Sequence, residues 1–304
     1  MKYISAHKKG LLKQQITAAK TRLEACDLCP RMCGVNRMAD ELGTCKTGQW
    51  AWISSIHAHM GEESPLVGIN GSGTIFFTHC NLLCNFCQNY EISHQGEGRP
   101  VDDNQLAQCM LSLQRDGCHN INFVTPSHVV PQILSALEIA IDQGLKIPLV
   151  YNTSAYDRVE TLQLMDGIVD IYLPDFKFWD SGIAEKTCQA PDYPQVACQA
   201  ILEMHRQVGD LKMDSSGIAK SGLMIRHLVL PNNLAGTEAV MTFIAEQIST
   251  DTYVNIMPQY RPCGQVHQIE EMASTVSAQE FQAALEIAGK VQHDGIATLV
   301  KTYL

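Results

Sequence analysis

Three closely spaced cysteines, Cys80, Cys84 and Cys87, are the residues of this 304-residue chain best suited to chemistry. They lie in the segment CNLLCNFC, which has the spacing C-x3-C-x2-C. A structural zinc site normally takes four protein ligands, whereas a four-iron (4Fe-4S) cluster held by three thiolates keeps one iron free to bind another molecule. The spacing predicts a cluster of this second kind. A zinc site completed by a fourth ligand such as His79, or three thiols that bind nothing, are the alternatives.

A second group of cysteines lies near the N-terminus, with the spacing C-x2-C-x3-C-x11-C. Four thiolates can close a metal site completely. Pro30 and Gly34 favour tight turns whose amide groups point at sulfur. Zinc and a second four-iron cluster both match this ligand count, and ordinary thiols are the third alternative. The candidate ligands are Cys26, Cys29, Cys33 and Cys45.

The composition narrows the class of protein. Apolar residues make up 45% of the chain and charged residues 18%, which is typical of a folded globular protein. Lys and Arg number 22 against 32 Asp and Glu, a net charge of -10. A negative net charge disfavours nucleic acid as a partner, because the phosphate backbone is negative as well. We find no secretory signal and no apolar run of about 18 residues, so we expect a soluble cytoplasmic protein with no membrane partner. Its twelve cysteines suit metal binding in a reducing compartment.

The elements that must position these residues follow an alternating pattern. From residue 75 onward, short β-branched runs alternate with helical patterns roughly every 30 residues, as in repeated βα units around a parallel sheet. The expected strands are 74–78, 120–125, 148–153, 168–174, 223–230 and 253–257. Asp102 or Asp103 should cap the first helix, and Ser277 with Glu280 a last long helix.

This pattern predicts the fold class and the domain organisation. Six units are too few for a closed eight-unit barrel, so we expect an α/β fold, a partial (β/α)6 TIM-like barrel. Residues 1–70 should form a small cysteine-rich N-terminal region that carries the second metal site. Residues 71–304 should form the barrel, with residues 68–73 as the hinge and residues 296–300 closing the chain.

Polar side chains gather where the expected strands end. Ligand-binding groups in parallel α/β folds collect at the carboxyl edge of the sheet, and the three-cysteine loop follows the first strand directly. We therefore expect a binding site at this edge. Its candidate residues are Thr125, Ser127, His128, Asn152, Ser154, Asp175, Lys177 and Gln259.

The three-cysteine loop, with Phe86 just before its last cysteine, resembles the cluster loop of the radical S-adenosylmethionine (SAM) superfamily. The resemblance covers about residues 70–260, and the partial barrel is also the usual fold of that superfamily. It implies that the free iron binds the amino and carboxylate groups of SAM. An electron from the reduced cluster would then split SAM into methionine and a 5'-deoxyadenosyl radical, which abstracts a hydrogen atom from the substrate. A flavodoxin or ferredoxin is the implied electron donor.

Several longer motifs are similar to a branch related to pyruvate formate-lyase activating enzymes. They are CPRMCGVNR (29–37), GTIFFTHCNLLCNFCQNYEIS (73–93), NFVTPSH (122–128), PDFKF (174–178), RHLVLP (226–231) and MPQYRP (257–262). This resemblance implies a glycyl radical enzyme as the substrate. Two motifs depart from the branch: the second strand ends in Thr-Pro-Ser-His instead of Gly-Gly-Glu, and the fourth reads Asp-Phe-Lys instead of Asp-Leu-Lys. The alternatives are radical modification of a small molecule or peptide, and a non-catalytic iron–sulfur or zinc protein.

The resemblance also implies roles for the residues at the strand ends. Thr125, Ser127 and His128 would border the methionine part of SAM, or else form a turn that caps the next helix. Asp175 and Lys177 share a face of their strand. The lysine could pair with the SAM carboxylate while the aspartate orients it, or the two could form a plain buried ion pair.

Two further strand ends complete the expected SAM site. Asn152 and Ser154 could contact the ribose hydroxyls, or satisfy the loop backbone instead. Gln259 lies at the sixth strand end, the edge that approaches the cofactor in the activating enzymes, and a solvated loop is the alternative there.

Overall fold

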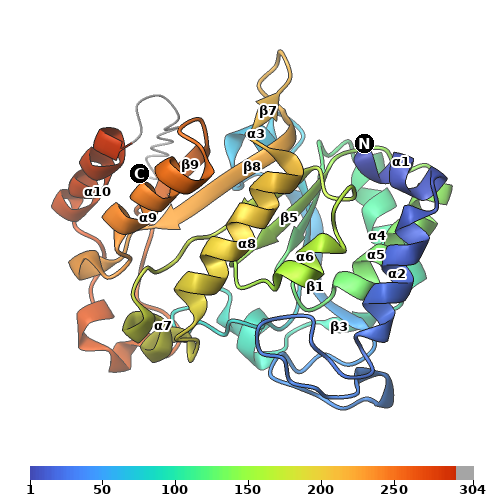
Figure 1. The fold of residues 1–304 in the computed structure, drawn as a ribbon, viewed down its shortest axis with the longest axis horizontal. Helices are drawn as coiled ribbons and strands as arrows, with labels where there is room; N and C mark the ends of the chain where they lie inside the picture. Colours follow the sequence, from blue (N-terminus) through green and yellow to red (C-terminus); the bar gives the residue numbers. More distant parts are fainter. Residues whose placement is uncertain (292–304) are drawn as a thin grey trace.

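The computed structural model describes residues 1–291, and one mixed sheet organises them (Figure 1). The sheet has nine strands in the order β3-β1-β2-β4-β5-β6-β8-β7, with β9 paired to β8. The strands are β1 (Ala51–His59), β2 (Ser72–Phe77), β3 (Arg99–Val101), β4 (Ile121–Val124), β5 (Leu149–Thr153), β6 (Ile171–Pro174), β7 (Lys212–Met213), β8 (Ala219–Leu228) and β9 (Tyr253–Met257).

Six of these strands form the parallel core of the sheet. These strands, β2, β4, β5, β6, β8 and β9, pair parallel with one another, and helical segments separate them in the chain. They correspond to the six strands expected from the sequence. The sheet ends at β3 on one side and at β9 on the other, so it does not close on itself. The predicted α/β fold with a partial (β/α)6 barrel is confirmed.

Two expected strands have different bounds in the structure. β6 begins at Ile171, because the amides of Ile168 and Val169 bond to the Met165 carbonyl and continue the preceding turn. β8 begins at Ala219, because part of the polar segment 211–221 forms an antiparallel pair of β7 with β8. Local apolar patterns do not reveal such turn and hairpin bonds, which depend on where the neighbouring chain lies.

Ten helices and six short 3-10 or π segments accompany the sheet within the described residues. Figure 1 shows α8 crossing the sheet, and α1 and α2 beside α4 and α5. The helices are α1 (Lys2–Lys8), α2 (Leu11–Thr21), α3 (Ser64–Val67), α4 (Asp103–Arg115), α5 (Val130–Asp142), α6 (Val159–Gln163), α7 (Ser181–Cys188), α8 (Tyr193–Val208), α9 (Thr237–Phe243) and α10 (Ala278–Val291). The short segments are η1 (Arg37–Ala39), η2 (Glu91–Gln95), η3 (Pro231–Asn233), η4 (Ile244–Ile248), η5 (Val266–Gln268) and η6 (Glu270–Met272).

The two predicted helix caps are present. At α4 the Asp102 carboxylate accepts a hydrogen bond from the Gln105 amide, and the Gln105 side chain accepts one from the Asp102 amide. Before α10, Ser277 and Glu280 form the same reciprocal arrangement. Such bonds satisfy amides that the first helical turn leaves without partners.

The N-terminal residues contact the barrel sheet directly. β1, which precedes the expected boundary at residue 70, pairs antiparallel with β2, which follows it. Helix α2 contacts α5, and the cysteine-bearing segment between α2 and β1 has little regular structure. The expected closing segment 296–300 lies outside the described residues.

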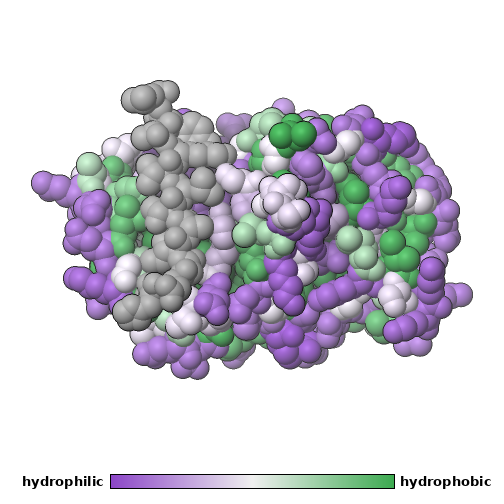
Figure 2. Space-filling view, turned by 90° about the horizontal axis from the view of Figure 1, so that it is seen from above, coloured by the Kyte–Doolittle hydropathy of each residue, from purple (hydrophilic) through white to green (hydrophobic). Residues whose placement is uncertain are grey.

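One face of the molecule shows how polar and apolar side chains are distributed on it. On the face seen in Figure 2, hydrophilic side chains predominate and apolar ones form separate small patches. None of the helices in residues 1–291 combines the length and the apolar character needed to cross a lipid bilayer.

A buried histidine in β8 makes stability depend on pH. His227 Nδ1 donates to the Phe176 carbonyl at 2.9 Å, and Nε2 accepts from the Thr237 hydroxyl at 3.0 Å. Burial lowers the pKa of His227 to about 4, against about 6.5 for an unperturbed histidine. The unfolded chain therefore takes up the proton more readily, and stability falls as the pH drops from about 6.5 towards 4.

We expect this residue to lower the free energy of unfolding by about 2 kcal/mol between pH 7 and pH 5. Urea denaturation at the two pH values measures the effect. The variant His227→Gln should lose correspondingly less stability over the same interval. An equal loss in both proteins would contradict the assignment.

Candidate functional site

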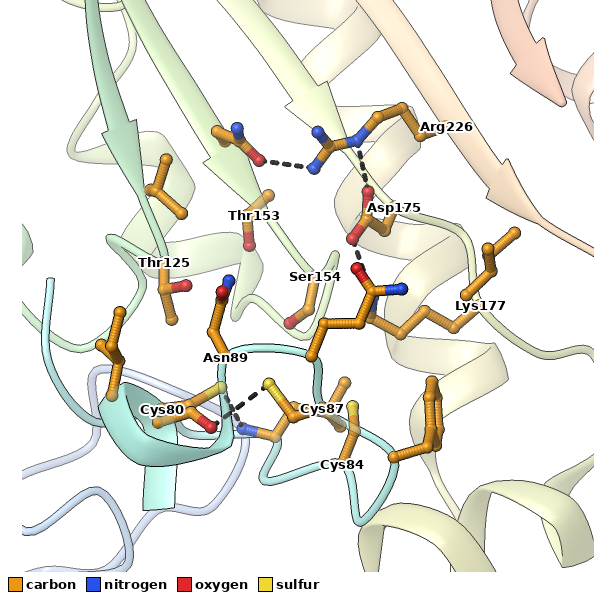
Figure 3. A pocket seen from close by; sticks show the side chains of 18 of the residues that line it. Cys80, Cys84, Cys87, Asn89, Thr125, Thr153, Ser154, Asp175, Lys177 and Arg226 are labelled. Atoms are coloured by element: carbon orange, nitrogen blue, oxygen red, sulfur yellow. Dashed lines mark hydrogen bonds and ion pairs between the residues drawn. The ribbon is translucent and has the colours of Figure 1, made fainter. Parts of the chain in front are cut away.

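A cavity of about 300 Å³ lies at the carboxyl ends of the parallel strands, and we call it the barrel cavity. Cys80, Cys84 and Cys87 line one wall, on the loop that follows β2. Figure 3 shows these cysteines on one side of the space and strand-end side chains on the other. Six of the eight predicted strand-end residues line the cavity: Thr125, Asn152, Ser154, Asp175, Lys177 and Gln259.

The thiols of the three cysteines influence one another. Burial and, to a lesser extent, the nearby Cys84 and Cys87 raise the pKa of Cys80 to about 12. Burial followed by the charge of Cys84 likewise raises the pKa of Cys87. Three thiolates this close would repel one another without a positive partner. A cationic metal centre removes this repulsion and deprotonates its thiol ligands, so the donor set fits such a centre.

Hydrogen-bond donors reach two of the sulfur atoms. The Leu82 amide donates to Cys80 Sγ at 3.3 Å, and the Ser93 hydroxyl donates to Cys87 Sγ at 3.2 Å. Donors of this kind stabilise negative charge on sulfur. They therefore suit thiolates better than thiols.

Left-handed backbone conformations shape the cavity wall. His79 and Leu83, in the cysteine loop, have φ values of 69° and 59°, and Thr125 at the end of β4 has φ of 61°. Such values are uncommon outside glycine, and a β-branched residue like Thr125 is strained there. Strain of this type concentrates at functional sites.

A buried ionic network forms the floor of the barrel cavity. Arg226 Nε donates to Asp175 at 2.6 Å, and Lys177 Nζ donates to the same carboxylate at 2.7 Å. Burial alone would raise the pKa of Asp175, but the charges of Arg226 and Lys177 outweigh it and lower that pKa. The aspartate is therefore a fixed anion between two cations.

The network continues to an acidic residue before α3. Arg226 Nη1 donates to Glu62 at 2.9 Å, and Nη2 donates to the Asn152 side-chain oxygen at 2.7 Å. Glu62 also accepts bonds from the amides of Asn152 and Asn122, at 2.9 and 3.0 Å. The bonds of Arg226 to Asp175, Glu62 and Asn152 use three of the five donors of its guanidinium. The bond to Asp175 uses one of the three donors of Lys177 Nζ, so Lys177 keeps donor capacity for a ligand.

Ser154 is a polar group suited to contact a ligand. It lines the barrel cavity, and its buried hydroxyl oxygen has no hydrogen-bond partner among residues 1–291. A buried hydroxyl without a partner is costly, so a bound molecule that reaches it gains a hydrogen bond.

Two predicted residues lie elsewhere. Ser127 is buried against Thr153, with 3.1 Å between their hydroxyl oxygens, and does not line the barrel cavity. His128 donates from Nε2 to the Thr78 carbonyl at 3.0 Å and faces the second cysteine group instead. The left-handed turn at Thr125 carries the chain away from the cavity. We therefore leave both residues out of the proposed ligand site.

Sequence reasoning missed three residues of this region. Arg226 was part of a quoted motif, and as the only charged residue within the strand segment LMIRHLVL it could have been singled out. Glu62 lies 164 positions away in the chain and no local pattern marks it. Cys188 belongs to neither cysteine group of the sequence. It lies beside Cys84, and their hydrogen bond, followed by burial, raises the pKa of the Cys84 thiol.

The N-terminal cysteines surround a second, much smaller cavity of about 10 Å³, the N-terminal cavity. All four predicted ligands line it, together with Arg37 and His128. Burial and, to a lesser extent, Cys45, Cys26 and Cys33 raise the pKa of Cys29 to about 12. Within the part of the chain that is described, no three or more His, Cys, Asp or Glu side chains converge as the ligands of a single metal ion.

Comparisons with known proteins identify a relative by sequence and a similar solved structure. No protein-family model matches this chain. The uncharacterized protein MJ0674 of Methanocaldococcus jannaschii is 32% identical over 295 residues, which cover 94% of this chain and 81% of the relative. The crystal structure of methylornithine synthase (PylB) aligns with a TM-score of 0.47 at 14% identity, over 70% of this chain and 60% of that chain.

Proposed function

This chain belongs to the same family as the uncharacterized protein MJ0674 of Methanocaldococcus jannaschii, and we propose that it is a radical SAM enzyme. The observation that carries the proposal is the set of three thiols facing a cavity at the carboxyl ends of an open parallel sheet. The spacing of Cys80, Cys84 and Cys87 supports the same conclusion.

The three thiolates would hold a 4Fe-4S cluster and leave one iron for SAM. When bound, the cluster and SAM would supply a 5'-deoxyadenosyl radical through one-electron reductive cleavage. The protein's part is to keep the sulfur atoms together and to exclude water. Leu82 and Ser93 would donate hydrogen bonds to the coordinated sulfurs, and such bonds tune the reduction potential of a cluster.

The strand ends would bind and orient SAM. Lys177 would pair with its carboxylate, because Asp175 holds the lysine charged while leaving it further donors. Ser154, whose hydroxyl has no partner among residues 1–291, would bond to a ribose or amino group. Arg226 would act as a positioning residue, since its hydrogen bonds hold Asp175, Glu62 and Asn152 in place.

Product analysis tests this proposal. The protein is reconstituted anaerobically with iron and sulfide, reduced with dithionite and incubated with SAM. We expect 5'-deoxyadenosine and methionine in equal amounts, and only when both reductant and SAM are present. A cluster that is reduced by dithionite without forming these products would instead indicate a non-catalytic iron–sulfur protein, and zinc without a cluster would indicate a zinc protein.

The hydrogen donor is the finer part of the proposal. The motifs that resemble those of activating enzymes, two of them with departures, support a glycine of a partner protein as the hydrogen donor, with a flavodoxin or ferredoxin as the electron source in the cytoplasm. Peptides or small molecules are the competing substrates. Deuterium transfer from a glycine-labelled partner into 5'-deoxyadenosine would identify the first class, and transfer from a labelled small molecule would contradict it.

A further inference from the structure

The N-terminal cavity has the composition of a metal site. Four thiols line it, three of them almost fully buried: Cys26, Cys29 and Cys45. The fourth, Cys33, is half-buried and accepts a hydrogen bond from the Thr44 amide at 3.4 Å. Four unpaired thiols around one cavity, with no disulfide among them, are far more than packing requires.

The arrangement of the four thiols indicates which kind of metal centre the N-terminal cavity suits. A tetrahedral zinc site needs its ligands to converge on one ion. Within the described residues no three of these side chains converge in that way. A cubane holds each thiolate at a different iron corner, so its ligands need not converge on one ion. The arrangement therefore suits a cubane better than zinc.

A buried cation balances the charge that such a centre carries. Arg37 is 1% exposed, and its Nη1 lies 3.9 Å from Cys26 Sγ. The rest of its guanidinium is held by the Gly48 carbonyl, at 3.0 and 2.8 Å, and the His128 carbonyl, at 2.8 Å. A buried arginine fixed beside sulfur by three carbonyl bonds offsets the negative charge of a thiolate-ligated cluster.

We propose that Cys26, Cys29, Cys33 and Cys45 bind a second 4Fe-4S cluster, separate from that of the barrel cavity. Since all four irons would have protein ligands, this cluster has no open position for SAM. It can serve in one-electron transfer or in holding the fold, and not in substrate binding.

The second centre would adjoin the first. Arg31, between two of the proposed ligands, donates to the carbonyls of Asn81 and Leu82, at 2.9 and 3.1 Å, inside the barrel-cavity loop. His128 connects the N-terminal cavity to Thr78, two residues before Cys80. The two cysteine loops are therefore in direct contact, an arrangement suited to passing an electron from a flavodoxin or ferredoxin through one cluster to the other.

Metal analysis of the reconstituted protein tests this inference without any activity assay. Two clusters give about eight iron atoms per chain, and either one alone gives about four. We expect Cys84→Ala and Cys29→Ala each to keep about four, and the matched control Cys198→Ser, a cysteine outside both cavities, to keep about eight. Mössbauer spectra of Cys84→Ala should show a four-iron cluster. Cys33→Ser, at the half-buried ligand, is the milder variant if Cys29→Ala does not fold.

Other outcomes would overturn the inference. A single zinc ion at this site, or a single iron without sulfide, excludes a second cluster. The same conclusion follows if the wild type, Cys29→Ala and Cys33→Ser all contain equal amounts of iron. The test also separates this inference from the proposed function. Suppose the wild type holds only about four irons, Cys84→Ala keeps them and Cys29→Ala loses them. The N-terminal cysteines then bind the cluster and the barrel cavity binds none, so this inference stands and the proposed function fails.

Discussion

Replacing Cys84 with alanine is expected to abolish the formation of 5'-deoxyadenosine. Cys84 is buried between Cys80 and Cys87 in the loop, and its thiol faces the barrel cavity. Two remaining thiolates cannot hold a four-iron cluster with a single open iron. The loss should exceed the roughly 10–100-fold effect that is typical of removing an outer partner of a metal ligand. Product formation and iron content of the reconstituted variant measure it.

Cys188→Ala is the matched control for this experiment. Cys188 is a buried thiol beside Cys84, but it does not line the barrel cavity. We expect this variant to keep both the cluster and the product. If Cys188→Ala loses the product while Cys84→Ala retains it, the assignment of ligands is wrong.

Replacing Arg226 with methionine is expected to destabilise the fold and to remove activity together. Arg226 joins Asp175 and Glu62, and its side chain is only 16% exposed. Without it, the buried carboxylates of Asp175 and Glu62 both lose their bonds to the guanidinium. Removing one partner from a buried ionic network typically costs about 3–5 kcal/mol. Urea denaturation measures this loss, and SAM cleavage should fall because Asp175 and Asn152 lose the bonds that orient them.

Arg206→Met is a suitable control, because Arg206 also contacts two carboxylates, those of Glu203 and Asp166, while its own side chain is 56% exposed. Solvent weakens exposed ion pairs, so we expect a loss of at most about 1 kcal/mol and unchanged activity. Similar losses of stability in the two variants would show that the Arg226 network contributes no more than a surface pair. Unchanged SAM cleavage in Arg226→Met would argue against its positioning role.

Local sequence patterns were sufficient for the parallel core of the fold. The β-branched runs, the helix stripes and the caps at Asp102 and Ser277 act over a few residues, so they predicted the six parallel strands and two of the helix starts. The six strand-end residues that line the barrel cavity were also predictable, because parallel strands bring their carboxyl ends to one edge. Their roles as ligands stay predictions.

Contacts between distant segments required the three-dimensional structure. Glu62 meets Arg226 across 164 positions, and Cys188 reaches Cys84 from the end of α7. The direction of a side chain beyond a strand end depends on the backbone turn that follows, and the left-handed conformation of Thr125 directs His128 to the N-terminal cavity. Residue types and their spacing thus define which groups can bind metal. Which groups share one cavity depends on how remote segments pack. That packing is the sum of many weak contacts, which no local sequence pattern records.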